Sequence, residues 1–72
     1  MQRYSNRSGG SGVYSYETGS NYIKVKFRTG RSYLYTYRSA GRRNIENMKQ
    51  LAERGSGLNS YINTNVKYNY AR

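Results

Sequence analysis

The sequence predicts an α+β fold, with a three-stranded antiparallel meander followed by two helices packed on one sheet face. The first half of the chain contains short segments in which apolar and polar residues alternate, separated by turn residues. The second half carries apolar residues at helical spacing. A length of 72 residues suits one domain. We interpret residues 1–12, rich in Gly and Ser, as a flexible tail and residues 13–72 as the single folded domain.

Three strands are expected, over residues 13–17, 22–28 and 31–37. The middle one gives the clearest signal, because its apolar residues alternate with Lys and Arg at a period of two. The intervening residues 18–21 and 29–30 are Thr, Gly, Ser and Asn, which favour turns. Because these connections are short, we expect neighbouring strands to run antiparallel.

The loop between the second and third strands decides which residues share a face of the sheet, since a slip of one residue turns every side chain over. A two-residue loop would require a positive φ at Thr29, which a β-branched residue resists. A three-residue loop over residues 28–30 requires a positive φ only at Gly30. We therefore prefer the three-residue loop.

The preferred register pairs Val25 with Tyr33 and Ile23 with Tyr35, so these tyrosines pack toward the helices. The outer face then carries Lys24, Lys26, Ser32, Leu34 and Thr36. The alternative register would instead place basic side chains beside the tyrosines, as a platform on which bases could stack.

Residues 42–54 are predicted to form a helix, because their apolar side chains fall on one stripe. Ser39 is expected to cap its N-terminus. The stripe consists of Ile45, Met48, Leu51 and Ala52. Gly and Ser at 55–57 end this helix and start a second one, whose apolar side chains again lie on one side. They are Leu58, Tyr61, Ile62 and Val66.

The charge of the chain is its strongest functional signal. Thirteen Lys and Arg residues face three acidic residues, which gives a formal net charge of +10. A small domain usually carries a net charge of magnitude about 2–8 for solubility. A larger excess repels itself unless an anionic partner relieves it. We therefore expect a negatively charged partner, while charge that serves solubility alone stays the alternative.

The composition argues against catalysis and against bound cofactors or metals. The chain has neither His nor Cys, the commonest general base and the commonest soft metal ligand. Its acids, Glu17, Glu46 and Glu53, are isolated in sequence. Gly and Ser at 9–12 are not followed by the Lys and Ser/Thr of a phosphate-binding loop. No apolar run approaches the roughly 20 residues of a membrane span. We expect a non-enzymatic, cytoplasmic protein that does not bind membranes.

The candidate binding residues are basic side chains that could contact phosphates. Arg38, Arg42 and Arg43 cluster before and at the expected helix start, where backbone amides also favour an anion. Arg3 and Arg7 lie in the expected tail, where they could become ordered on a polyanion. The full set of candidates is Lys24, Lys26, Arg28, Arg31, Arg38, Arg42 and Arg43. For any one of them, an ordinary solvated side chain is the simpler interpretation, so the set as a whole is the hypothesis.

Short motifs along most of the chain follow a recognisable order. Tyr-Ser-Tyr-Glu at 14–17 precedes a strand with Ile, Val and Phe at alternate positions. Gly30 and a Tyr-x-Tyr pair follow, and a closing segment at 61–70 reads Tyr-Ile-Asn-Thr-Asn-Val-Lys-Tyr-Asn-Tyr. This order resembles the KTSC domain, named for its place at the C-terminus of some lysyl-tRNA synthetases. The family usually has Val-Pro between the third strand and the helix, where this chain has Arg-Ser-Ala-Gly at 38–41. The resemblance implies a small α+β domain, and its attachment to a synthetase suggests RNA binding.

Two functions are consistent with these observations. The leading hypothesis is sequence-tolerant binding of RNA or single-stranded nucleic acid, in which Arg and Lys contact phosphates. The alternative is a protein-interaction module, an accessory or inhibitor that docks on an acidic protein surface through a few Tyr or Arg anchors.

Overall fold

The computed structural model describes residues 2–5 and 12–71. Its strands are β1 (Gln2–Arg3), β2 (Val13–Thr18), β3 (Tyr22–Phe27) and β4 (Ser32–Thr36). They form one antiparallel sheet in the order β1-β2-β3-β4. The helices are α1 (Tyr37–Ala40), α2 (Arg42–Arg54) and α3 (Leu58–Tyr61), and α3 continues into the π-helical segment η1 (Ile62–Val66). The predicted α+β class is confirmed.

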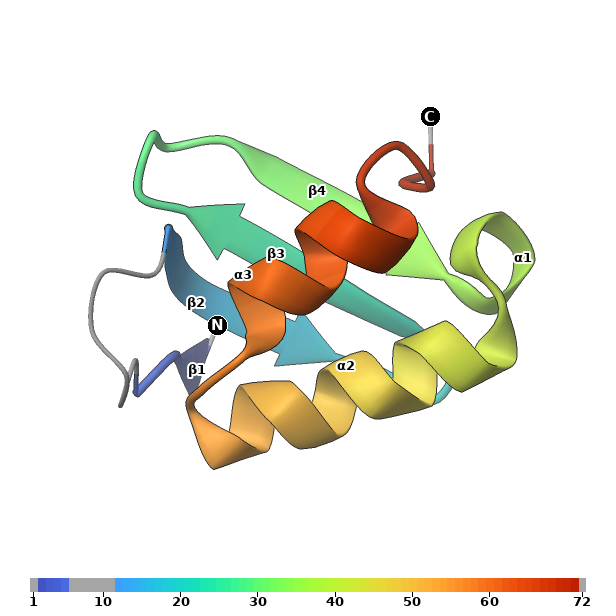
Figure 1. The fold of residues 1–72 in the computed structure, drawn as a ribbon, viewed down its shortest axis with the longest axis horizontal. Helices are drawn as coiled ribbons and strands as arrows, with labels where there is room; N and C mark the ends of the chain where they lie inside the picture. Colours follow the sequence, from blue (N-terminus) through green and yellow to red (C-terminus); the bar gives the residue numbers. More distant parts are fainter. Residues whose placement is uncertain (1, 6–11, 72) are drawn as a thin grey trace.

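The helices α2 and α3 lie against one face of the sheet, as the sequence predicts (Figure 1). The helix stripes supply Ile45, Met48, Leu58 and Ile62, all almost fully buried. They pack with apolar side chains from the facing side of the strands. Those strand residues are Val13, Tyr16, Ile23, Val25 and Tyr35. The opposite face of the sheet, which we call the open sheet face, carries no helix in the described part of the chain.

The hairpin between β3 and β4 has the predicted three-residue loop. Gly30 adopts a φ of 93°, and its N–H donates to the carbonyl of Phe27 over 2.9 Å. Val25 is therefore paired with Tyr33 and Ile23 with Tyr35. Both tyrosines face the helices, and Tyr35 is only 1% exposed. The expected side of the tyrosines is confirmed, and the basic platform of the alternative register does not form.

The expectation of three strands is wrong, because Gln2 and Arg3 add a fourth strand at the edge of the sheet. They pair with Tyr16 and Ser15 of β2. Tyr4 follows them, and its N–H donates to the carbonyl of Tyr14 over 3.1 Å. A two-residue strand shows no alternation, so nothing in the Gly- and Ser-rich segment predicted it. The rest of the expected tail, residues 1 and 6–11, lies outside the described residues.

The expectation of two helices is also wrong, because the short helix α1 precedes α2. Ser39 does not cap α2. It lies in the first turn of α1, in a capping box with Thr36, whose hydroxyl accepts from the Ser39 N–H over 3.0 Å. Gly41, with a φ of 93°, separates α1 from α2. An L-residue resists this backbone conformation, so the chain changes direction at a glycine.

Candidate functional site

The open sheet face brings together side chains from β1, β2 and β3. Across the sheet, Arg3 is paired with Ser15, Ser15 with Lys26, and Lys26 with Ser32. These pairings place Arg3 and Lys26 on the same face, with one strand between them. Of the two, Arg3 is exposed and Lys26 is half-buried. The open sheet face thus presents one cation on each side of β2.

Tyr14 stands between these cations because β2 contains a bulge. The register between β2 and β3 shifts from Val13 to Ser15. The bulge lets Val13 and Tyr16, three residues apart, both face the core, at 1% and 3% exposure. It leaves the ring of Tyr14 43% exposed on the open side. Bulges often redirect a side chain in this way near functional sites.

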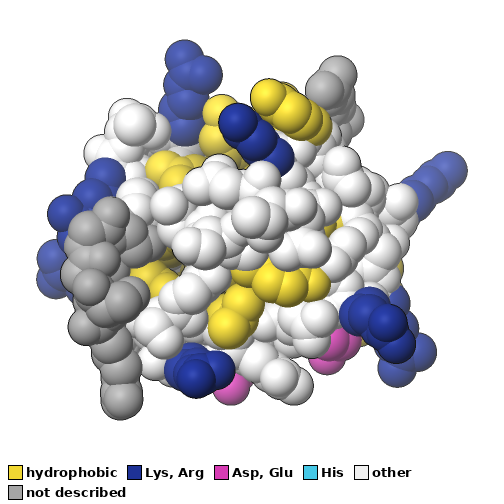
Figure 2. All heavy atoms as spheres, in the orientation of Figure 1, with side chains coloured by type: hydrophobic (Ala, Val, Ile, Leu, Met, Phe, Trp, Pro, Cys, Tyr) yellow, Lys and Arg dark blue, Asp and Glu magenta, His cyan; other side chains and the backbone are white. Residues whose placement is uncertain are grey.

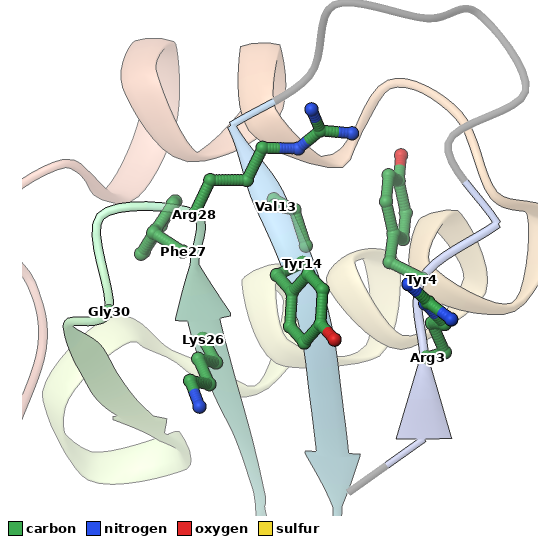
Figure 3. Close-up of a pocket in the computed structure, with 8 residues that line it drawn as sticks. All are labelled: Arg3, Tyr4, Val13, Tyr14, Lys26, Phe27, Arg28 and Gly30. Atoms are coloured by element: carbon green, nitrogen blue, oxygen red, sulfur yellow. The ribbon is translucent and has the colours of Figure 1, made fainter.

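Both cations contact the Tyr14 ring. The guanidinium carbon of Arg3 lies 5.2 Å from the ring centroid, and Nζ of Lys26 lies 5.9 Å from it. Cations within about 6 Å of an aromatic ring are attracted by its π-face, although exposed contacts of this kind are weak. Figure 3 shows Lys26 and Arg3 on opposite sides of Tyr14, with the helices behind the sheet.

These side chains line an open hollow of about 640 Å³, which we call the Tyr14 hollow. Arg28 reaches across the beginning of β2 at its upper rim (Figure 3). A hydrogen bond from the Arg28 N–H to the Gly12 carbonyl, 2.8 Å long, holds the backbone of Arg28 beside β2. The described lining residues are Arg3, Tyr4, Val13, Tyr14, Lys26, Phe27, Arg28 and Gly30. The hollow therefore combines basic side chains with an exposed aromatic ring.

The cluster of Arg38, Arg42 and Arg43 lies elsewhere. Arg38 belongs to α1 and the other two to the first turn of α2. All three are exposed. The strand β4 ends at this junction and begins near the hairpin that carries Arg28 and Arg31. Six of the seven predicted binding residues are thus divided between two ends of the molecule, and Lys24 lies between them on β3.

The acidic side chain of Glu46 offsets part of the charge near the α1–α2 junction. The Tyr37 hydroxyl donates to Glu46 over 2.7 Å, and Lys49 forms an ion pair with the same carboxylate over 3.1 Å. These two hydrogen bonds, with the positive charges of Lys49 and Arg42 nearby, lower the pKa of Glu46. The carboxylate therefore stays ionised beside Arg42. In Figure 2 the acidic side chains appear at the lower edge, beside α2.

The cations of the Tyr14 hollow have no such neighbour among the described residues. Within residues 2–5 and 12–71, the ion pair is the one between Lys49 and Glu46. Lys24 lies two residues before Lys26 on β3 and is paired with Glu17 of β2. The Glu17 carboxylate also accepts a hydrogen bond from the Tyr22 hydroxyl over 3.1 Å. Among the described residues, Lys26 and Arg28 therefore have no acidic partner in an ion pair.

The structure thus selects among the predicted residues and adds two. Lys26 and Arg28 meet at the Tyr14 hollow, and Arg31 is exposed on the adjoining hairpin. Tyr14 was missed as a binding residue, and Arg3 was expected in a flexible tail and not in the sheet. Nothing in the sequence reveals that Arg3 joins the sheet, and a regular strand would put Tyr14 on the same side as Tyr16. Arg7 lies outside the described residues.

Comparisons with known proteins identify no relative. No family model matches the chain, no curated protein matches it, and no solved structure matches it. The resemblance to the KTSC domain therefore stays a prediction. In the described residues, no helix is long and apolar enough to cross a membrane.

Proposed function

We propose that this protein binds RNA or single-stranded nucleic acid without strong sequence preference and without catalysis. The observation that carries the proposal is the open sheet face, where Arg3, Lys26 and Arg28 surround an exposed Tyr14. Phosphates supply the charge that this face attracts, and bases supply the flat surfaces that an aromatic ring contacts. The resemblance to a domain attached to tRNA synthetases points the same way by analogy.

The proposed path of the bound nucleic-acid strand follows the basic side chains that form no ion pair in the described residues. Lys26 and Arg28 are its central phosphate contacts, and Arg31 extends the path along the hairpin. Lys24 contributes less, because Glu17 lies opposite it on β2. A second group at the α1–α2 junction, Arg38, Arg42 and Arg43, would contact a longer strand. Such contacts are sequence-independent, since every nucleotide carries the same phosphate.

Fluorescence anisotropy with a labelled single-stranded RNA, repeated from about 50 to 300 mM salt, tests the proposal. Phosphate contacts release counterions, and each contributes about 0.7 to the log–log salt slope for a single strand. We expect submillimolar binding near physiological salt and a slope of several units. The double variant Lys26→Ala/Arg28→Ala should lower the slope by about 1.4, the contribution of two contacts.

The matched control removes two positive charges from the helix layer. Arg54 ends α2 and Lys67 follows η1, and both side chains are exposed. The variant Arg54→Ala/Lys67→Ala has the same net charge as the test variant, yet should keep the wild-type slope. Equal losses in the two variants would mean that net charge alone drives binding, which contradicts a localised interface.

An acidic protein in the same titration separates the nucleic-acid proposal from its rival. RNA that binds no better than the acidic protein, or only at the lowest salt, would overturn the proposal. The interaction module that docks on an acidic protein surface would then be the function to pursue by affinity capture.

A further inference from the structure

The Tyr14 hollow has the components of a subsite for a flat, uncharged group next to an anion. Its volume of about 640 Å³ lies within the range of small-ligand sites, about 300–1,000 Å³. Its exposed aromatic surface is the ring of Tyr14, which is 43% exposed, while Val13 and Phe27, which also line it, belong to or pack against the core. Lys26 and Arg28 provide positive charge at the rim. A nucleotide has this combination of a planar base and a phosphate.

We propose that the Tyr14 hollow holds one unpaired base, stacked on the Tyr14 ring, while Lys26 and Arg28 contact the flanking phosphates. This inference rests on the proposed function and adds a preference for single strands over duplexes. In a duplex the bases are paired and stacked on one another, so a duplex can offer only its backbone. An unpaired base is free to enter.

The cations now beside the Tyr14 ring do not prevent this stacking. Arg3 and Lys26 have long, flexible side chains, and exposed cation–π contacts are weak. Phosphates attract both side chains more strongly than the ring does, because the phosphate carries a full charge. When these cations turn to the backbone of the nucleic acid, a ring face becomes available to a base. The contacts seen in the free protein thus keep the cations close to where the phosphates will lie.

The test compares a single-stranded RNA with the duplex of the same sequence, using Tyr14→Leu. Leucine keeps an apolar side chain and removes the π-face. Loss of one stacked base should weaken single-strand binding by about 5- to 150-fold. Duplex affinity should stay within about twofold, and the salt slope should not change, because the phosphate contacts remain. Tyr14→Phe, which retains the ring, should bind like the wild type.

Tyr68→Leu is the matched control. Tyr68 is also an exposed tyrosine, at 68%, with a cation beside it, since Nζ of Lys67 lies 5.4 Å from its ring centroid. It follows η1 on the helix layer, so its replacement should leave single-strand affinity unchanged. A fluorescent adenine analogue in the strand gives a direct readout, because its emission should change on binding to wild type and much less on binding to Tyr14→Leu.

Each outcome decides the matter. Equal single-strand affinities for Tyr14→Leu, Tyr68→Leu and wild type, with a reduced slope for Lys26→Ala/Arg28→Ala, would overturn stacking and keep the proposed function. A wild-type protein that binds no RNA at physiological salt would overturn both. Circular dichroism verifies folding, and Tyr14→Thr replaces the Leu variant if that variant does not fold, because threonine favours strands.

Discussion

Replacing Tyr4 should strongly destabilise the protein, although Tyr4 lies in a segment whose composition is typical of a tail. Its ring is 4% exposed and belongs to the hydrophobic core. Its hydroxyl accepts a hydrogen bond of 3.3 Å from the buried N–H of Leu58, at the start of α3. Tyr4 therefore connects the end of β1 to the helix layer. Tyr4→Phe removes only the hydrogen bond, and Tyr4→Ala removes the ring as well.

The expected costs follow from these contacts. Leaving the Leu58 amide without its acceptor should cost Tyr4→Phe about 1–2 kcal/mol. Loss of a buried aromatic ring usually costs about 3–5 kcal/mol, which we expect for Tyr4→Ala. Native stability of about 0.05–0.15 kcal/mol per residue gives about 4–11 kcal/mol for 72 residues. Tyr4→Ala should therefore remove a large part of the total stability.

Urea denaturation followed by far-ultraviolet circular dichroism measures both changes. Thermal unfolding should show a fall of about 4–16 °C for Tyr4→Phe, from the usual shift of about 4–8 °C per kcal/mol for a domain of this size. Tyr68→Ala, at a 68% exposed site, is the control and should change stability by less than about 0.5 kcal/mol. A Tyr4→Ala protein that unfolds at the same urea concentration as this control would refute the assignment of β1 and Tyr4 to the fold.

Three further predictions concern the hairpin and the pH dependence of stability. Gly30→Ala should lower the free energy of unfolding, measured by urea denaturation, by about 1–2 kcal/mol, because alanine resists the positive φ of this position. A Cβ at residue 30 meets no neighbouring atom, so no steric clash adds to this cost. Burial, helped by Tyr33 and Tyr70, raises the pKa of Tyr35 to about 12. The neutral hydroxyl of Tyr35 therefore stabilises the fold fully below pH 10, and this stabilisation should be lost as the pH rises to about 12. The free energy of unfolding of Tyr35→Phe should fall less over the same pH range. The hydrogen bond from Tyr37 lowers the pKa of Glu46. The ionised Glu46 therefore stabilises the fold above pH 4.5, and this stabilisation is lost as the pH falls through the lowered pKa. In an NMR titration, Tyr37→Phe should move the Glu46 pKa upward.

Local patterns predicted those parts of the fold that depend on neighbours in sequence. The alternation over β3 and the stripe of α2 each follow from the geometry of one element. The register of β4 followed from the steric difference between Thr29 and Gly30, which the structure confirms through the positive φ of Gly30. Ser39 was placed wrongly because Thr36, assigned to a strand, also serves as the cap of α1.

The candidate site was less predictable, because it depends on contacts between distant segments. Composition indicated a basic surface, and Lys26 and Arg28 were among the candidates. Their meeting with Arg3 required the pairing of β1 with β2, which is accompanied by the burial of Tyr4 in the core. The exposure of Tyr14 required a bulge, and a bulge has no sequence signature in this strand.

The sequence by itself therefore determined the α+β class, the three longer strands, the register of their last hairpin and the apolar faces of the helices. Each of these is set by periodicity or by the backbone preference of one residue. Tertiary structure alone decided that Arg3 lies across β2 from Lys26, that Tyr14 faces outward between them, and that Arg38, Arg42 and Arg43 lie at the other end of β4. Pairing across a sheet joins residues far apart in the chain, and its free energy comes from burial that no local pattern records.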